Sequence, residues 1–171
     1  MKIKEHVPNM LTLLNLTLGM LAIISVLKGE YSDAAMLILL AAFTDRLDGN
    51  FARKFDVVSE VGKQLDSICD FASFGVAPAV LIWSFTLEDF GTSGMMVAII
   101  FTISGAYRLA KYNVVEFDGA YIGLPITISG GIVALVTLYG LNYSLNTFVA
   151  VVITLLLSYA MNSKKLRIKK I

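Results

Sequence analysis

Six apolar segments of roughly twenty residues each recur along the chain, and they constrain its fold more than any other feature. An α-helix needs about 20 mostly apolar residues to cross about 30 Å of hydrocarbon. The sequence therefore predicts an all-α integral membrane protein with six transmembrane helices. The approximate bounds of these spans are 10–27, 32–52, 64–86, 94–113, 121–141 and 144–162.

The composition agrees with a membrane protein of one domain. Hydrophobic residues make up 57% of the 171 residues, more than in a typical soluble domain. A single cysteine, Cys69, excludes an intrachain disulfide framework. No Gly/Ser-rich or Pro-rich linker divides the chain, and the net charge of +1 gives no indication of a nucleic-acid partner. We therefore expect one transmembrane domain over residues 1–171.

The first ten residues have a basic character and precede the first apolar segment. Lys2 and Lys4 stand ahead of Pro8, as in the charged start of a secretory signal. However, the apolar segment is followed by Lys28 rather than by a small-residue cleavage site. The sequence predicts a short interfacial helix that leads into a retained first span.

The basic residues predict the orientation of the six spans. Cytoplasmic loops of membrane proteins are enriched in Lys and Arg. With six spans, only Lys28 of the fourteen basic residues falls on one side, so the other side and both termini are predicted to be cytoplasmic in the cell membrane. A model with five spans would put the basic C-terminal residues outside. The thirteen residues on the predicted cytoplasmic side are Lys2, Lys4, Arg46, Arg53, Lys54, Lys63, Arg108, Lys111, Lys164, Lys165, Arg167, Lys169 and Lys170.

Four aspartates lie at the edges of the second and third apolar segments. In helices, Asp45 and Asp48 stand at i and i+3, and Asp66 and Asp70 at i and i+4, so each pair shares a helix face. A carboxylate near hydrocarbon is costly unless it pairs, binds a metal or lines a wet cavity. If the two helices are antiparallel neighbours, the four carboxylates converge on one site.

Oxygen ligands of this kind favour a hard cation such as Mg²⁺ or Mn²⁺. Two divalent ions that clamp a phosphoryl group are the expected chemistry. A structural network of ion pairs between the aspartates and neighbouring cations is the alternative interpretation. Those cations are Arg46, Arg53, Lys54 and Lys63.

The spacing of this stretch resembles that of the CDP-alcohol phosphotransferase family. All eight positions of the family's pattern are filled, in the order Asp45-x-x-Asp48-Gly49-x-x-Ala52-Arg53, eight residues, then Gly62-x-x-x-Asp66-x-x-x-Asp70. The resemblance implies transfer of a phosphatidyl group from a CDP-linked lipid, CDP-diacylglycerol or CDP-archaeol, to an alcohol, with release of CMP. The resemblance also implies that the protein is a homodimer and that it contacts the lipids of the membrane.

The same resemblance assigns roles to individual residues. Asp45, Asp48 and Asp66 are expected to hold two Mg²⁺ or Mn²⁺ ions. Asp70 shares in metal binding and acts as the general base on the acceptor hydroxyl. The residues expected to contact the CDP-lipid are Asn9, Thr12, Asp48, Gly49, Ala52, Arg53 and Gly62; as an alternative, Asn9 caps the start of a helix.

Three further segments are similar to the phosphatidylserine synthase branch of that family, which uses L-serine as the acceptor. They are Ser73-Phe74-Gly75-x-Ala77-Pro78, Arg108-Leu109-Ala110-Lys111-Tyr112-Asn113 and Gly123-Leu124-Pro125. The second departs from the branch's R-L-A-R-F-N at Lys111 and Tyr112. After Gly123-Leu124-Pro125, the branch's common continuation Ser-Pro is replaced by Ile126 and Thr127.

Candidate serine contacts follow from these segments, each beside a structural alternative. Arg108 and Lys111 are candidates to hold the serine carboxylate. As an alternative, they are basic residues at the cytoplasmic end of the fourth span that only set its orientation. Asn113 orients the ammonium group or caps a helix. Ser73 binds the acceptor or bonds its own helix backbone.

Two other functions are weighed against serine transfer. The first is the same chemistry with another alcohol, such as glycerol 3-phosphate or inositol phosphate. The second is a divalent-cation transporter, which would need acidic groups through the whole membrane depth rather than at one face. The small residues 104–106 and 129–131 permit close helix packing, either within the chain or between chains.

Overall fold

The computed structural model describes residues 3–55, 60–114, 120–164 and 167–169, with side chains described for 9–47, 60–114 and 123–164. Six helical segments and one pair of short strands make up these residues. The elements in order are α1 (Ile3–Leu27), α2 (Tyr31–Phe55), α3 (Glu60–Asp70), the π-helix η1 (Phe71–Val76), α4 (Ala77–Phe85), the 3₁₀-helix η2 (Leu87–Phe90), α5 (Gly91–Val114), β1 (Ala120–Ile122), α6 (Ile126–Tyr143), α7 (Thr147–Asn162) and β2 (Arg167–Lys169).

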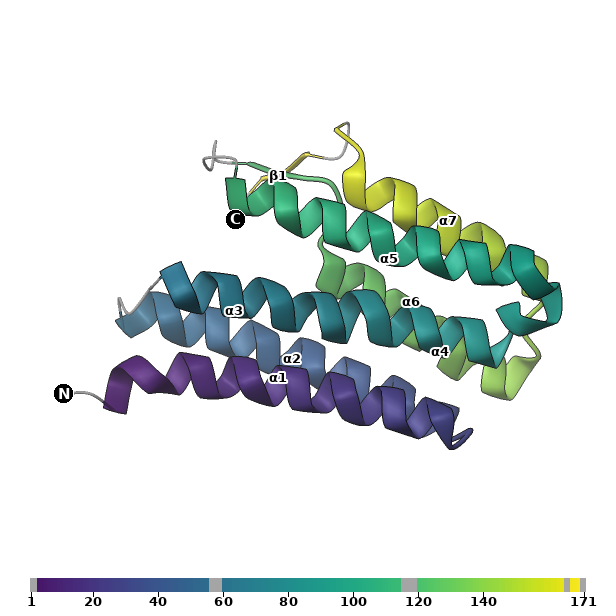
Figure 1. Cartoon of the computed structure of the whole chain (residues 1–171), viewed down its shortest axis with the longest axis horizontal. Helices are drawn as coiled ribbons and strands as arrows, with labels where there is room; N and C mark the ends of the chain where they lie inside the picture. Colours follow the sequence, from purple (N-terminus) through teal and green to yellow (C-terminus); the bar gives the residue numbers. More distant parts are fainter. Residues whose placement is uncertain (1–2, 56–59, 115–119, 165–166, 170–171) are drawn as a thin grey trace.

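The helices run side by side along the long axis of the molecule (Figure 1). α1 packs on α2, α2 on α6, and α5 on α7. The connections α1–α2, α4–α5 and α6–α7 lie at one end of the bundle, on the right in Figure 1. The start of α1, the end of α2, the start of α3 and the strand pair lie toward the other end. The six helical segments, called passes below, alternate in direction along the bundle.

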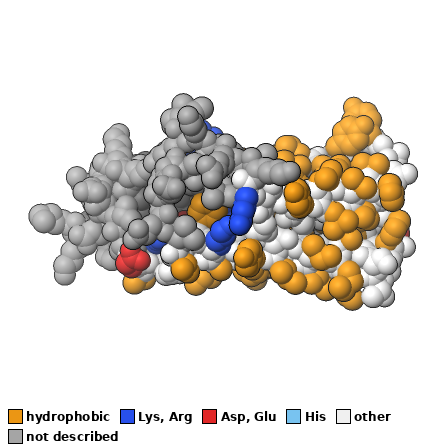
Figure 2. All heavy atoms as spheres, turned by 90° about the horizontal axis from the view of Figure 1, so that it is seen from above, with side chains coloured by type: hydrophobic (Ala, Val, Ile, Leu, Met, Phe, Trp, Pro, Cys, Tyr) orange, Lys and Arg blue, Asp and Glu red, His pale blue; other side chains and the backbone are white. Residues whose placement is uncertain are grey.

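The length and composition of the helices indicate a membrane protein. Four helical stretches are long and apolar enough to cross a bilayer, namely Asn9–Leu27, Glu60–Phe85, Leu87–Val114 and Ile126–Tyr143, and Thr147–Asn162 is a shorter apolar helix. Hydrophobic side chains gather on the right-hand part of the face seen in Figure 2, and the visible Lys and Arg side chains lie near its middle and to the left. The helical fold predicted from the sequence is confirmed.

Two details of the prediction are wrong. The expected interfacial helix is not a separate element, because α1 is continuous from Ile3 through Pro8; the fixed φ of proline suits a helix, so the loss of one backbone bond does not end it. The predicted span 121–141 begins only at Ile126, since β1 pairs with β2 in antiparallel fashion just before it. Gly123 has a φ of 81° there, and a Cβ would overlap the carbonyl of Met161.

The third pass contains the π-helix directly after Asp70. Pro78 accounts for the wider turn, because it has no N–H for the carbonyl of Phe74 and its ring crowds that carbonyl. Gly130 of α6 faces this turn: a Cβ on Gly130 would lie 2.9 Å from the Phe74 oxygen. The small residues of α6 therefore serve close packing within the chain.

The two adjacent glycines of α6 provide a test of this packing. Gly130→Ala should destabilise the protein by about 1–3 kcal/mol, because the new methyl group meets backbone that cannot move aside. Gly131→Ala is the control, since its Cβ would lie 3.9 Å from Leu39, an ordinary contact. Thermal unfolding in detergent measures both, and equal melting temperatures for the two variants would contradict the packing described.

Candidate active site

The aspartate cluster, which we define as Asp45, Asp66 and Asp70, brings α2 and α3 together. One carboxylate oxygen from each of the three residues lies within 4.8 Å of the others, and all three side chains are half-buried. The predicted convergence of the two helices on one acidic site is confirmed for these three residues. Asp48 lies on α2, but its side chain is outside the described residues.

Two neutral side chains from other helices donate hydrogen bonds to the cluster. Asn15 Nδ2 of α1 lies 3.1 Å from Asp70 Oδ1, and Thr127 Oγ1 of α6 lies 3.3 Å from Asp45 Oδ2. An ionised carboxylate only accepts hydrogen bonds, so each of these side chains presents the donor that such a carboxylate needs. Four passes of the bundle thus contribute to one site.

The donor set of the cluster fits a hard divalent cation. Three carboxylates at such short separation repel one another unless a cation lies between them, and oxygen ligands suit Mg²⁺ or Mn²⁺. Of the cations in the alternative ion-pair network, Arg46 and Lys63 have exposed side chains. The side chains of Arg53 and Lys54 lie outside the described residues.

The residues expected to contact the CDP-lipid are described in part. Asn9 and Thr12 lie on α1, and the Thr12 side chain is buried against the bundle. Gly62 precedes Asp66 by one turn on α3. The predicted contacts Gly49, Ala52 and Arg53 lie on α2, at positions whose side chains are outside the described residues.

Two of the four candidate serine contacts are buried. Ser73 is fully buried, and its hydroxyl donates to the main-chain carbonyl of Asn15, 3.0 Å away on α1, rather than to its own helix. Arg108 is 6% exposed; its Nε donates to the Leu124 carbonyl at 2.7 Å and its guanidinium lies 4.5 Å from the centre of the Tyr112 ring. Arg108 is therefore held in one orientation by a carbonyl and an aromatic face.

The other two candidates lie at the end of α5. Asn113 accepts a hydrogen bond from Ser67 at 3.1 Å and donates to Gln64 at 3.3 Å, so its amide joins α5 to α3 instead of capping its own helix. Lys111 is half-buried in the last turn of α5. The end of α5 is thus connected to the helix that carries Asp66.

Comparison with known proteins identifies the family of this site. The model of the CDP-alcohol phosphatidyltransferase family matches residues 5–161. The chain belongs to this family. The matched residues include the aspartate cluster, so the acidic site formed by α2 and α3 is the candidate active site.

Several curated relatives resemble this CDP-alcohol phosphatidyltransferase over most of its length. It is 35% identical to the CDP-diacylglycerol–serine O-phosphatidyltransferase of Bacillus subtilis over 161 residues, which are 94% of this chain and 88% of that one. It is 41% identical to the protein of that name from Methanocaldococcus jannaschii over 149 residues (85% of this chain, 67% of that one). It is 34% identical to the archaetidylserine synthase of Methanothermobacter thermautotrophicus over 154 residues (88% and 66%).

Sequence reasoning did not find the two donors to the cluster. Thr127 was noted only as a departure from a related pattern, although it contacts Asp45. Asn15 stands three residues after Thr12 in a mostly apolar segment, and an amide on the inward face of a membrane helix is the signal that could have indicated it. Neither partner follows from the sequence alone, because each contact joins residues far apart in the chain.

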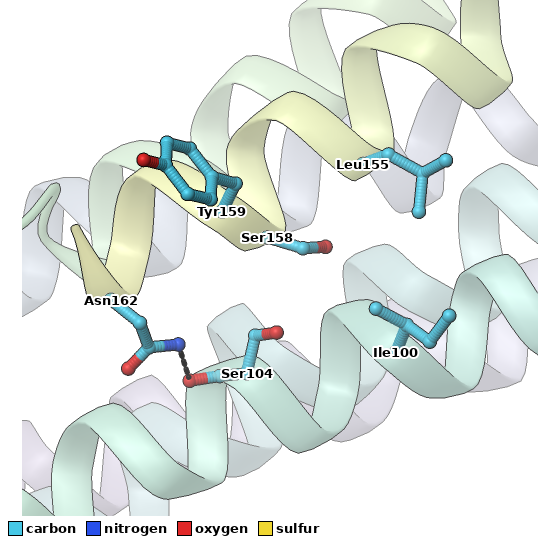
Figure 3. A pocket seen from close by; sticks show the side chains of 6 residues that line it. All are labelled: Ile100, Ser104, Leu155, Ser158, Tyr159 and Asn162. Carbon is cyan, nitrogen blue, oxygen red and sulfur yellow. Dashed lines mark hydrogen bonds between the residues drawn. The ribbon is translucent and has the colours of Figure 1, made fainter.

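A hollow lies between α5 and α7, and no residue of the aspartate cluster lines it (Figure 3). It has a volume of about 350 Å³, and Asn162 spans it by donating to the Ser104 carbonyl at 3.0 Å. None of the residues expected to bind substrate or metal lines it. The lining residues are Ile100, Ser104, Leu155, Ser158, Tyr159 and Asn162.

Removal of the Thr127 hydroxyl tests how the cluster is held. Thr127→Val should weaken Mn²⁺ binding by about tenfold, because a hydrogen-bonded ligand loses its orienting partner. Thr137→Val is the control on the same helix, where a buried hydroxyl donates only to the Val133 carbonyl. Titration of Mn²⁺ followed by electron paramagnetic resonance compares the two, and equal affinities would contradict the role given to Thr127.

Proposed function

We propose that this enzyme transfers a phosphatidyl or archaetidyl group from a CDP-linked lipid to L-serine and releases CMP. The observation that carries the proposal is the aspartate cluster, in which the acidic pattern of the family comes together at one end of a membrane bundle. The acceptor is proposed from the names of the relatives and from the segments around Ser73 and Arg108. Divalent-cation transport is disfavoured, since Asp45, Asp66 and Asp70 lie together rather than along the bundle.

The chemistry assigned to the protein is the activation of a hydroxyl group. Asp70 takes the proton of the serine hydroxyl while the serine oxygen attacks the phosphorus that carries the lipid. The bond between that phosphorus and the oxygen of the leaving CMP breaks. Asp45, Asp48 and Asp66, with Asp70, would hold two Mg²⁺ or Mn²⁺ ions. Such ions neutralise the charge on the pyrophosphate and on the leaving CMP. Asn9, Thr12, Gly49, Ala52, Arg53 and Gly62 are proposed to contact the CDP-lipid.

Serine recognition is assigned to the end of α5. The guanidinium of Arg108 is a planar donor that suits a carboxylate, and its position is fixed by Leu124 and Tyr112. Lys111 is proposed to add a second positive charge. These groups also suit an acceptor that bears a phosphate, so the acceptor has to be decided by assay.

The proposed topology has six membrane passes with both termini and the site on the cytoplasmic side. The six alternating helical segments and the excess of Lys and Arg at the predicted cytoplasmic side support it. In this arrangement CDP-lipid reaches the site from the bilayer and serine enters from the cytoplasm. The resemblance to the family further suggests a homodimer.

The reaction is tested by CMP release from the purified protein with CDP-diacylglycerol and Mn²⁺. We expect release that depends on L-serine and not on glycerol 3-phosphate, inositol phosphate or buffer alone. Release with one of the other alcohols would overturn the serine assignment but keep the enzyme class. If no acceptor works, CDP-archaeol replaces the ester lipid, and failure with both lipids would refute the proposed reaction.

Asp70→Asn tests the general base. It should lower serine-dependent turnover by at least about 100-fold, within the range that proton transfer contributes, while the melting temperature stays close to that of the wild type. Asp89→Asn is the control, because Asp89 is exposed in η2 at the opposite end of the bundle. Full turnover by Asp70→Asn would refute the assignment of the base.

Cysteine labelling in intact cells tests the topology. In a Cys69→Ala background, Glu88→Cys should react with a membrane-impermeant thiol reagent from outside. Lys164→Cys should react only after lysis, because the site end of the bundle faces the cytoplasm. Glu88 and Lys164 are both exposed, so the difference measures sidedness rather than burial. The reverse labelling pattern would contradict the orientation.

A further inference from the structure

Asn15 is an uncommon residue for its position. It lies on the face of α1 that turns into the bundle, in line with Thr12, Leu18 and Ala22, and it is 0% exposed. An amide on this inward face of α1 loses its contact with water, which is unfavourable unless hydrogen bonds replace that contact. The contacts of Asn15 therefore indicate why the helix has an amide at this position.

The amide nitrogen of Asn15 is directed at Asp70. Nδ2 lies 3.1 Å from Asp70 Oδ1, and because an ionised carboxylate only accepts, the NH₂ group is the half of the amide that faces it. In the part of the chain that the structure describes, Asn15 Oδ1 is buried and no donor reaches it. One half of the amide is thus left unsatisfied while the other half bonds the proposed base.

The backbone of Asn15 is held by a second bond. Ser73 is fully buried in η1, and its hydroxyl donates to the Asn15 carbonyl at 3.0 Å. Gly19, one turn further along α1, lies against Ser73 so closely that any Cβ at that position would overlap it. α1 is therefore held against the turn that begins directly after Asp70.

We propose that Asn15 is a positioning residue for Asp70, and that Ser73 holds Asn15 in place. The bond from Nδ2 fixes the rotation of the Asp70 carboxylate relative to Asp45 and Asp66, and as a neutral donor it adds no positive charge to compete with a metal ion. This inference rests on the proposed function of Asp70. It places Ser73 in the support of the base rather than in contact with the acceptor.

A matched pair of asparagines separates positioning from general packing. Asn15 joins α1 to α3. Asn162 joins α7 to α5 through its bond of 3.0 Å to the Ser104 carbonyl, in a hollow that no residue of the aspartate cluster lines (Figure 3). Leu is similar in size to Asn, so each replacement removes one amide that bridges two helices and keeps most of the side-chain volume. If Asn15 only holds helices together, the two variants should behave alike.

The experiment measures kcat and KM for CDP-lipid and L-serine, together with the melting temperature, for Asn15→Leu, Asn162→Leu and the wild type. We expect Asn15→Leu to lower kcat 10- to 100-fold, the range found when a partner that orients a ligand is removed, with both KM values within about threefold. Asn162→Leu should keep the kcat of the wild type. Equal kcat values for the two variants, or a loss in KM alone, would overturn the proposal.

Two more variants keep the test decisive if Asn15→Leu does not fold. Asn15→Asp has the same shape but presents an acceptor to Asp70, so its kcat should also fall at least tenfold; wild-type kcat would overturn the proposal.

Ser73→Ala should lower kcat without raising the KM for serine. Ser158→Ala is the control and should not lower kcat, because the buried Ser158 hydroxyl donates to the Thr154 carbonyl. A raised KM for serine alone in Ser73→Ala would return Ser73 to the acceptor site and refute its support of Asn15.

The wild type in the same assay separates this inference from the proposed function. If the wild type releases no CMP with serine, the proposed reaction fails, and with it the inference that depends on it. If the wild type turns over and Asn15→Leu and Asn15→Asp match it, the reaction stands and only the role of Asn15 is refuted.

Discussion

The mutual repulsion of three carboxylates is the constraint on which the rest of the structure depends. The three carboxylate oxygens lie within 4.8 Å of one another, and two unit charges at that distance repel by about 3–4 kcal/mol for an effective dielectric constant of 20. A bundle with mostly apolar surfaces offers little water to screen them. Hydrogen-bond donors and a bound cation would offset this repulsion, and Asn15 and Thr127 supply two such donors.

The bundle provides these donors from helices that carry no aspartate of the cluster. α1 contributes Asn15 to Asp70, and α6 contributes Thr127 to Asp45. α5 contacts α3 through an amide in its last turn, while its buried arginine bonds the backbone just before α6. These polar contacts link α1, α2, α3, α5 and α6 around the acidic site, and the close approach of α6 and α1 to the π-helix brings their donors within reach.

The sequence predicts much of this arrangement because some of its signals are local. The apolar segments predict the helices, and the spacing of Asp66 and Asp70 places them on one helix face, opposite Asp45 of the preceding pass. The contacts of Asn15 and Thr127 could not be predicted, since each depends on how distant helices pack. The late start of α6 could not be predicted for a similar reason. The strand pair that precedes α6 joins residues about fifty positions apart, and a hydropathy profile does not detect such pairing.

The central claim is that the aspartate cluster holds divalent ions that contact the phosphates of the CDP group. Electron–nuclear double resonance of the wild-type protein with Mn²⁺ and CMP measures this most directly, through the coupling between Mn²⁺ and the ³¹P nucleus. The account predicts bound Mn²⁺ with a ³¹P coupling typical of a directly coordinated phosphate, and loss of that signal in Asp66→Asn. Bound Mn²⁺ without ³¹P coupling, or an unchanged signal in Asp66→Asn, would contradict it.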